Sequence, residues 1–530
     1  MLCRSLSLLL VGWVSLVGCT QQQSSAAAQV HAQSFAIADT QEGPVQAVPA
    51  DGLLIYKGIP YAAPPVGELR WRAPQAALKR EQLLLADSFG KRCMQRPPNP
   101  QLKKRPEAYT QPESEDCLYL NIYRPDSSEG NLPVMVWIPG GGLVTGSGSR
   151  PVNHGGNLAR EGVVVVSINY RLGRFGFFAH PELSDLNPDN GALYNFGLMD
   201  QIAALQWVQA NISGFGGDPA RVTIMGESAG AASVDALLTS PPARGLFSAA
   251  IAQSGYGRGP QPRVAALAHA DDVPVEQIGL DIAKRLGTPE ASLAELRAVS
   301  AEKIVEATDF SGFISFAIDG VNLTDDLSNE FAEGRQAPVP LLIGSTDFEF
   351  GMVPPAMQRQ IMLGILPEAE HIGLAQDYGG AELRDHLLYN DYVFTAQARA
   401  LALSQARLGQ PVYLYRFAVP SAGMQLPLVG AAGVKGAGHA SDLPYMFGNF
   451  TGDHGEPLAP DNEQRWVSRQ MIRYWANFAK AGNPNGADLP AWSLFEGQSL
   501  MDFTLDGSQT VIDPWRDRLE RVNRLLGDFQ

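Results

Sequence analysis

The sequence predicts an α/β protein with a large, mostly parallel central sheet covered by helices on both faces. Short apolar runs alternate with helical patterns through most of the 530 residues, and 45 % of the chain is hydrophobic, which is ample for a large core. The runs are rich in β-branched residues and bounded by Gly, Pro or polar residues, as strands buried on both faces require. They are residues 134–138, 163–168, 222–225, 249–252 and 341–343. Strands that alternate with helices form parallel sheets through right-handed crossovers.

Helical periodicity marks the connections between these runs. Residues 201–211 place apolar side chains at helical spacing, which predicts a crossover helix. Two further helical regions, residues 265–310 and 355–410, are expected as insertions that roof a substrate cleft over the active site. In the first of them an apolar stripe ends at Gly287. Thr288 followed by Pro289 then predicts a new helix with Thr288 as its N-cap.

Composition does not divide the chain further, so we predict a single catalytic domain over residues 35–530. No internal repeat or long linker interrupts it. The formal net charge of −15 repels phosphate backbones, and we therefore expect no nucleic-acid partner. A basic run at residues 103–105 lies in a Pro-rich segment and is typical of a solvated face.

The N-terminal residues predict export. Arg4 precedes an apolar run over residues 6–17, which is shorter than the roughly 20 residues of a membrane span but suits a signal peptide. The run ends in a Leu-Val-Gly-Cys sequence that resembles the bacterial lipobox. We therefore expect residues 1–18 to be a lipoprotein-type signal peptide, Cys19 to carry lipid and residues 19–34 to be a flexible tether.

Such a protein is held at a membrane only by its lipid and faces the periplasm or the cell surface. The alternative is an ordinary cleaved signal and a soluble periplasmic or secreted protein. Two cysteines besides Cys19 and the signal-peptide Cys3 remain, Cys93 and Cys117. An even pair in an oxidising compartment predicts a disulfide, and the alternative is two buried thiols.

The local pattern that best predicts chemistry is Gly226-Glu227-Ser228-Ala229-Gly230, which follows the run at residues 222–225 and precedes a stretch of small residues. A serine on a tight strand-to-helix turn projects its hydroxyl at the carboxyl end of the strand, and glycines flank it because a Cβ there would clash with nearby backbone. The helix N-terminus also favours developing negative charge. Alone, the pattern is often a plain turn, but this strand-to-helix context favours a nucleophile.

A second signal is the glycine run Gly140-Gly141-Gly142, which follows the run at residues 134–138 through Pro139. Acyl transfer requires backbone N–H donors for the oxyanion, each worth about 3 kcal/mol in the transition state. By itself such a run indicates only a flexible loop. Its position after a buried strand makes it a candidate oxyanion-binding loop.

With these motifs in order, the sequence resembles the type B carboxylesterase/lipase family, which includes the cholinesterases and bacterial para-nitrobenzyl esterases. The resemblance runs from about Gly43 to the C-terminus. It is also carried by residues 56–62 (YKGIPYA), 115–121 (EDCLYLN), 169–173 (NYRLG), 215–219 (FGGDP) and 475–485 (WANFAKAGNPN). It implies an α/β-hydrolase fold and the hydrolysis of carboxylic esters.

The resemblance also implies the catalytic partners of Ser228. The family's acid lies five residues after a strand-end glycine, which places it at Glu349, with Asp347 as the rival carboxylate. The glycine that follows the acid in the family is Phe350 here. The family's base lies in a motif similar to residues 438–445 (GHASDLPY), which makes it His439.

Supporting roles follow from the same resemblance. The oxyanion donors are expected to be the backbone N–H groups of Gly141, Gly142 and Ala229. Pro139 and Leu143 stand where the family usually has His and Phe, so we expect altered loop packing or pocket shape with catalysis retained. The resemblance further implies a hydrogen bond from Ser254 to the acid, the Cys93–Cys117 disulfide, and structural ion pairs Arg70–Glu115 and Arg171–Asp200.

We therefore predict a carboxylic-ester hydrolase that acts through an acyl-enzyme on Ser228, with His439 as general base and acid and Glu349 orienting its imidazole. The expected partner is a small-molecule ester, with no metal and no organic cofactor, and no oligomeric state is predicted. Cholinesterase activity is disfavoured because residues 94–116 lack the tryptophan with which the family captures choline. The alternative function is a non-catalytic, cholinesterase-like binding or scaffold protein, a class that typically loses part of the triad.

Overall fold

The computed structural model describes residues 35–95, 111–256, 261–308, 314–349, 355–420, 436–451 and 456–525. The predicted signal peptide, the lipidation site at Cys19, the tether and the basic run at residues 103–105 lie outside these ranges. Within them, no helix is both long and apolar enough to cross a membrane.

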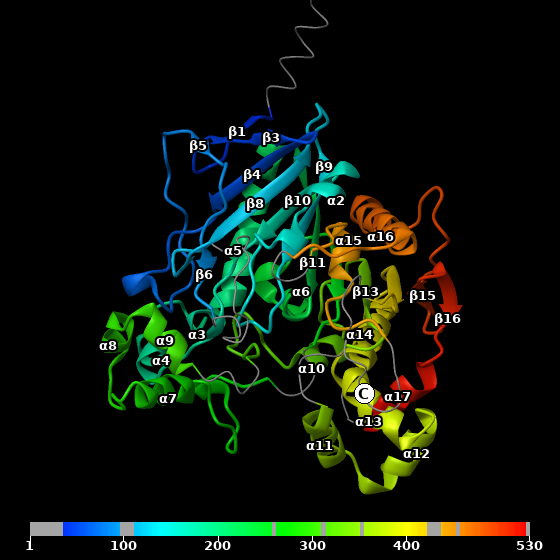
Figure 1. The fold of residues 1–530 in the computed structure, drawn as a ribbon. Coiled ribbons are helices and arrows are strands. Elements are labelled where there is room, and N and C mark those ends of the chain that lie inside the picture. The colour runs from blue at the N-terminus through cyan, green and yellow to red at the C-terminus, as the bar shows by residue number, and fades with distance from the viewer. Residues whose placement is uncertain are drawn as a thin grey trace, which may run out of the picture.

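A large sheet runs through the molecule, with helices on both of its faces (Figure 1). Seven adjacent strands, from β10 to β15, are parallel, and antiparallel strands complete both edges. This confirms the predicted α/β class. In spatial order the eleven strands are β16(Gly507–Ile512), β15(Ser499–Thr504), β14(Val412–Phe417), β13(Leu341–Thr346), β12(Ala249–Gln253), β11(Gly217–Glu227), β9(Leu132–Ile138), β10(Val164–Ile168), β8(Tyr119–Pro125), β4(Leu53–Pro60) and β3(Val48–Ala50).

The central strands are mostly apolar because most of their residues are buried on both faces of the sheet. In β9 every residue is buried, and successive side chains enter opposite cores. Val134, Val136 and Ile138 join one core, whereas Met135 and Trp137 join the other. A strand with this environment has no polar face, and this is why the sequence shows continuous apolar runs instead of alternation.

Each core is closed by its own set of helices. The first core packs α5(Phe196–Asn211), α6(Ala229–Thr239) and α14(Ala396–Arg407) against the sheet, and the second packs α2(Gly156–Arg160), α15(Leu443–Phe447) and α16(Asn462–Ala481). The predicted crossover helix at residues 201–211 is the larger part of α5. Shorter helices near the first core are α3(Gly173–Gly176), α4(Pro181–Leu186) and α10(Leu327–Ala332).

The two helical insertions lie away from β1(Ile37–Ala38) and β3 in Figure 1. The first contains α7(Gln277–Arg285), α8(Leu293–Ala298) and α9(Ala301–Ala307). In the second, α11(Pro355–Ile365), α12(His371–Asp377) and α13(Ala381–Asn390) form a satellite core with α17(Arg516–Leu525). Between α13 and α14 lies one π-helical turn, residues 391–395, which borders the candidate site described below.

The prediction that Thr288 begins a helix is wrong. Gly287 adopts φ +79°, and the Thr288 N–H donates to Ala283 O at 3.0 Å, so Thr288 closes the C-terminus of α7. The next helix, α8, begins only after Ser292, where Ser292 and Glu295 form a reciprocal capping box. Thr288, which resembled an N-cap in the sequence, instead uses its backbone N–H to end α7.

Candidate active site

Ser228 lies on the sharp turn between β11 and α6. Its backbone angles, φ 58° and ψ −124°, are strained for a residue with a side chain, and such strain concentrates at functional sites. The flanking glycines are required by space: a Cβ at Gly226 would collide with the Gly230 carbonyl group, and a Cβ at Gly230 would collide with the carbonyl oxygen of Ile138 on β9. The GESAG sequence therefore forms the predicted elbow because no larger residue fits on either side.

A chain of short contacts joins Ser228, His439 and Glu349, which come from three distant parts of the sequence. Ser228 Oγ lies 2.8 Å from His439 Nε2, and His439 Nδ1 lies 2.5 Å from Glu349 Oε2. Ser228 and Glu349 are buried, with exposed fractions of 4 % and 2 %. The three predicted residues are thus brought together in the order hydroxyl, imidazole, carboxylate.

Glu349 is fixed by groups other than the histidine. Its Oε1 accepts hydrogen bonds from Ser254 Oγ at 2.5 Å and from the Thr346 N–H at 2.7 Å. Its rival Asp347 is turned elsewhere, since Oδ1 of Asp347 accepts from the Ala437 N–H at 2.6 Å. Between the two candidate acids, only Glu349 contacts the imidazole.

The glycine loop, residues 139–148, packs directly against the elbow. A Cβ on Gly140 would collide with the carbonyl oxygen of Glu227 and would lie 3.2 Å from Ser228 Cβ. The carbonyl of Gly141 is turned into the loop, where it accepts from the N–H groups of Val144 and Thr145 at 3.1 and 3.0 Å. The loop therefore presents backbone, not side chains, to the serine.

The N–H groups of Gly141, Gly142 and Ala229 have no hydrogen-bond acceptor among the described residues. Two of them belong to glycines with positive φ, +116° and +64°, and the third begins α6 directly after the serine. Free N–H groups at this place are suited to bind an oxyanion. The family's usual His is replaced by Pro139, whose carbonyl accepts from Tyr170 Oη at 2.8 Å.

Acidic side chains surround the imidazole on more than one side. Glu227 Oε1 lies 3.3 Å from His439 Nε2, and burial raises the pKa of Glu227 to about 8. Burial alone would lower the pKa of His439, but Glu227 and Glu349 outweigh it and raise that pKa to about 9. The site is therefore built to stabilise an imidazolium.

Asp442 is a third buried acid near the imidazole. Burial raises its pKa to about 6, and its Oδ2 accepts from Gln253 Nε2 and Tyr415 Oη at 2.8 and 3.1 Å. Gln253 in turn accepts from Trp475 Nε1 at 3.1 Å. This network lies behind the triad, on the side of the second core.

Three neighbours of the triad were not predicted from sequence: Glu227, Asp442 and Phe394. Phe394, on the π-helical turn, has its ring centroid 5.0 Å from that of His439. Glu227 directly precedes Ser228, and Asp442 lies three residues after His439. The sequence signal that could have identified Glu227 and Asp442 was their closeness to residues of the predicted motifs. Nothing in the sequence marks Phe394.

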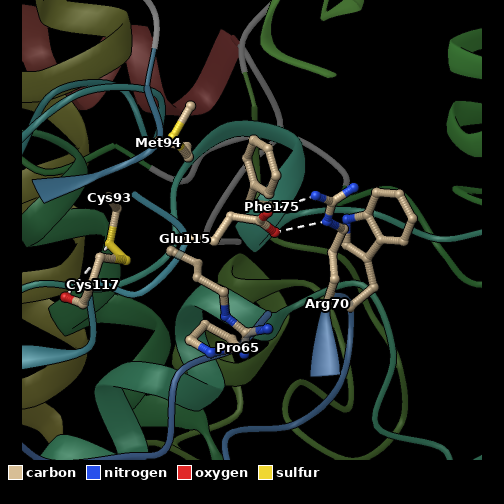
Figure 2. A pocket seen from close by; sticks show the side chains of 9 residues that line it. Pro65, Arg70, Cys93, Met94, Glu115, Cys117 and Phe175 are labelled. Atoms are coloured by element: carbon tan, nitrogen blue, oxygen red, sulfur yellow. Dashed lines mark hydrogen bonds and ion pairs between the residues drawn. A yellow bond between two sulfur atoms is a disulfide. The ribbon is translucent and has the colours of Figure 1, made fainter. Parts of the chain in front are cut away.

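The remaining predicted pairs are also present. Cys93 and Cys117 form a disulfide, and the ion pairs Arg70–Glu115 and Arg171–Asp200 have N–O distances of 2.6 and 2.7 Å. Figure 2 shows the disulfide and the first ion pair on the wall of one small pocket. Among the described residues, no group of three or more His, Cys, Asp or Glu side chains is arranged to hold a metal ion.

Comparison with known proteins agrees with this geometry. The sequence model described as the carboxylesterase family matches residues 37–371 and 375–518. Para-nitrobenzyl esterase of Bacillus subtilis (strain 168) is 36 % identical over 512 residues, covering 92 % of this chain and 98 % of the relative. Human cocaine esterase is 36 % identical over 479 residues, covering 84 % and 82 %. Fumonisin B1 esterase of Sphingopyxis macrogoltabida is 33 % identical over 524 residues, covering 94 % and 91 %.

Solved structures give the same result. A PNB esterase structure superposes with a TM-score of 0.76 at 33 % identity, covering 92 % of this chain and 99 % of its own. A thermophilic PNB esterase gives a TM-score of 0.77 at 32 % identity, with coverage of 92 % and 100 %. The fold is therefore that of these esterases. The chain belongs to the carboxylesterase family and is a carboxylic-ester hydrolase.

Proposed function

We propose that this carboxylesterase acts through an acyl-enzyme on Ser228, with His439 as general base and then general acid, and Glu349 orienting the imidazole. The observation that supports these roles most directly is the unbroken contact chain from Ser228 Oγ through His439 to Glu349 Oε2. With the Nδ1 proton donated to Glu349, Nε2 is left to accept the serine proton.

The reaction has two stages. In the first, Ser228 Oγ attacks the ester carbonyl carbon while Nε2 of His439 takes the hydroxyl proton, and the tetrahedral oxyanion accepts from the N–H groups of Gly141, Gly142 and Ala229. Collapse breaks the bond to the alcohol oxygen, and His439 donates its proton to that oxygen. In the second stage water attacks the acyl-enzyme by the same route. The acid leaves and Ser228 regains its proton.

The proposed substrates are small-molecule carboxylic esters. The relatives support this breadth, since their names specify a para-nitrobenzyl ester, cocaine and fumonisin B1. Para-nitrophenyl esters from acetate to palmitate test the function with wild type and Ser228→Ala. Activity lost in the variant supports the nucleophile, and the chain-length profile separates esterase from lipase. Full activity in Ser228→Ala contradicts the proposed triad.

A fluorophosphonate probe tests the alternative role as a scaffold. The probe reacts with an activated serine whatever the natural ester, so folded wild type is expected to be labelled and Ser228→Ala is not. Folded wild-type protein that neither turns over esters nor takes the label favours the non-catalytic function.

We further propose that the protein is exported and lipidated at Cys19, which the lipobox-like sequence supports. Labelled palmitate supplied to an expressing bacterium is expected to enter the wild-type protein and not Cys19→Ser. A wild-type protein released to the aqueous fraction without label favours the ordinary cleaved signal.

A further inference from the structure

We propose that Gln95 is a positioning residue for ester hydrolysis: its side-chain amide holds the glycine loop so that the oxyanion donors face Ser228, and the Cys93–Cys117 disulfide anchors that amide. The inference rests on the proposed oxyanion role of Gly141 and Gly142. It adds a residue outside the triad and outside the loop itself.

Gln95 pairs with the backbone of the glycine loop in both directions. Its Nε2 donates to Gly146 O at 3.1 Å, and its Oε1 accepts from the Gly146 N–H at 3.2 Å. The residue is buried, with 6 % exposed. An amide that satisfies both backbone groups of one residue fixes that residue in orientation as well as position.

Gly146 contacts the part of the loop that carries the oxyanion donors. Its φ is +128°, and a Cβ there would collide with the carbonyl oxygen of Gly140. The preceding residue, Thr145, donates from its N–H and its Oγ1 to Gly141 O at 3.0 and 3.2 Å. Because the two ends of the loop touch here, displacement of Gly146 is transmitted directly to Gly140 and, through Thr145, to Gly141.

The same amide is tied to the disulfide. Nε2 of Gln95 also donates to the carbonyl of Cys93 at 3.0 Å, and Cys93 is bonded to Cys117 in the disulfide that Figure 2 shows. The Cys117 carbonyl accepts from Asn169 Nδ2 at 3.2 Å. Two amide side chains therefore connect the two half-cystines to the glycine loop.

Asn169 completes the second connection, since its Oδ1 accepts from the Gly148 N–H at 2.9 Å and from Ser147 Oγ at 3.2 Å. Gln95 holds the loop at Gly146 and Asn169 holds it two residues later. Of the two, Gln95 bonds to the residue that touches Gly140, so we assign the positioning of the oxyanion donors to it.

Two variants remove this function in different ways. Gln95→Met keeps the length of the side chain and loses all three hydrogen bonds, whereas Gln95→Glu keeps an acceptor for the Gly146 N–H and places a carboxylate against two carbonyls. Each is expected to lower kcat about 10-fold to 100-fold with little change in KM, because a small misplacement of donors acts on the transition state.

A matched control variant distinguishes a positioning role of Gln95 from a purely structural one. Gln405 is buried on α14, and its Nε2 donates to the carbonyls of Ala337 and Val339 at 2.9 and 2.6 Å, before the start of β13. Gln405→Met is expected to lower Tm without lowering kcat. A loss of kcat in Gln405→Met equal to that in Gln95→Met overturns the inference, since the effect is then general destabilisation.

The readout specific to the oxyanion compares an ester with its thionoester, in which sulfur replaces the carbonyl oxygen and accepts hydrogen bonds weakly. Wild type is expected to prefer the oxygen ester strongly, and Gln95→Met to lose most of that preference. A trifluoromethyl ketone, which forms an oxyanion on the serine, is expected to bind more weakly to Gln95→Met by the same factor as kcat/KM falls.

These experiments distinguish a failure of the role proposed for Gln95 from a failure of the proposed function. If wild type hydrolyses both esters equally, the proposed oxyanion role of Gly141 and Gly142 fails. If wild type discriminates and Gln95→Met discriminates equally well at full kcat, the role of Gln95 fails and the proposed function stands.

The disulfide is tested by a double-mutant cycle on kcat/KM. Replacing Cys93 and Cys117 by Ala is expected to reduce kcat/KM, and to add little to the loss already caused by Gln95→Met, because both changes release the same contact. If the loss of kcat/KM in the combined variant equals the product of the two separate losses, the disulfide does not anchor Gln95.

Discussion

Glu227 and His439 are in direct contact: Glu227 Oε1 lies 3.3 Å from His439 Nε2, the same nitrogen that lies 2.8 Å from Ser228 Oγ. Glu349 contacts the other ring nitrogen at 2.5 Å, so the imidazole lies between two carboxyl groups. One carboxylate in this position orients a histidine. A second one on the far side shifts the proton affinity of the ring.

The pH dependence of hydrolysis is the first consequence. His439 acts as base only when it is neutral, and Glu227 and Glu349 together raise its pKa to about 9 against the effect of burial. kcat/KM for a para-nitrophenyl ester is therefore expected to rise about tenfold per pH unit below pH 9, to be half-maximal near pH 9 and to level off only above it. Glu227→Gln removes a carboxyl group that can give up its proton beside Nε2 and so favour the imidazolium, and its acid limb is therefore expected at lower pH. A limb that stays in place excludes a role for the Glu227 charge.

The assignment of the triad acid is tested by two neighbouring carboxylates. Glu349→Gln preserves shape but no longer holds the imidazole in the required tautomer, and kcat is expected to fall about 10³-fold to 10⁴-fold. Asp347→Asn is the matched change two residues earlier. It is expected to leave kcat within about 3-fold, since Asp347 bonds to the Ala437 N–H and not to His439. The reverse pattern would reassign the acid to Asp347.

Asp235 makes stability depend on pH. It lies on α6, is 2 % exposed, and neither of its carboxyl oxygens has a hydrogen-bond partner within the described ranges. Burial raises its pKa to about 8, above the value of an unfolded chain. Folding then favours the protonated acid, so the contribution of Asp235 to stability is greatest in acid. That contribution is lost as pH rises from the unfolded pKa, about 4, towards the folded one, and each pH unit in this interval costs about 1.4 kcal/mol.

Asp235→Asn removes this titration. The Tm of the variant is expected to exceed that of wild type at about pH 9 and to approach it at about pH 4, as followed by thermal unfolding across that range. A difference in Tm that does not change with pH would show that Asp235 does not ionise in the folded protein.

Two glycine-to-alanine changes test whether the elbow lacks room for a side chain. Gly230→Ala places a Cβ against the carbonyl of Ile138 and is expected to separate α6 from the glycine loop, with the loss of most activity and about 1–3 kcal/mol of stability. A Cβ on Gly364, in α11, meets no atom of the described chain within 4 Å. There alanine is expected to keep full activity and to stabilise by up to about 1 kcal/mol. Equal effects of the two changes would remove the steric explanation.

Sequence patterns predicted the centre of the sheet better than its edges. The five expected strands are β9, β10, β11, β12 and β13, which are adjacent, parallel and buried on both faces. The strands missed lie at either side of these. The partly exposed β4 carries Lys57, and β16 mixes buried and exposed residues, so neither shows an unbroken apolar run.

The active site divides in a similar way. Ser228 could be found from a local motif because its elbow, glycines and helix are contiguous. Glu349 and His439 are 121 and 211 residues further along the chain, and only the resemblance to a family placed them. Gln95 had no local signal, because its function depends on the backbone of Gly146, a partner that carries no side chain to form a pattern.

The parallel arrangement of the sheet has a consequence for the helical insertions. The elbow follows β11, Ser254 follows β12, Glu349 follows β13, and His439 lies beyond β14, so each strand of a fixed frame delivers one part of the chemistry. The long helical excursions between β12 and β13, and between β13 and β14, begin after these residues and return before the next strand. Those excursions can therefore differ in length and shape while the strands still bring Ser228, Glu349 and His439 together.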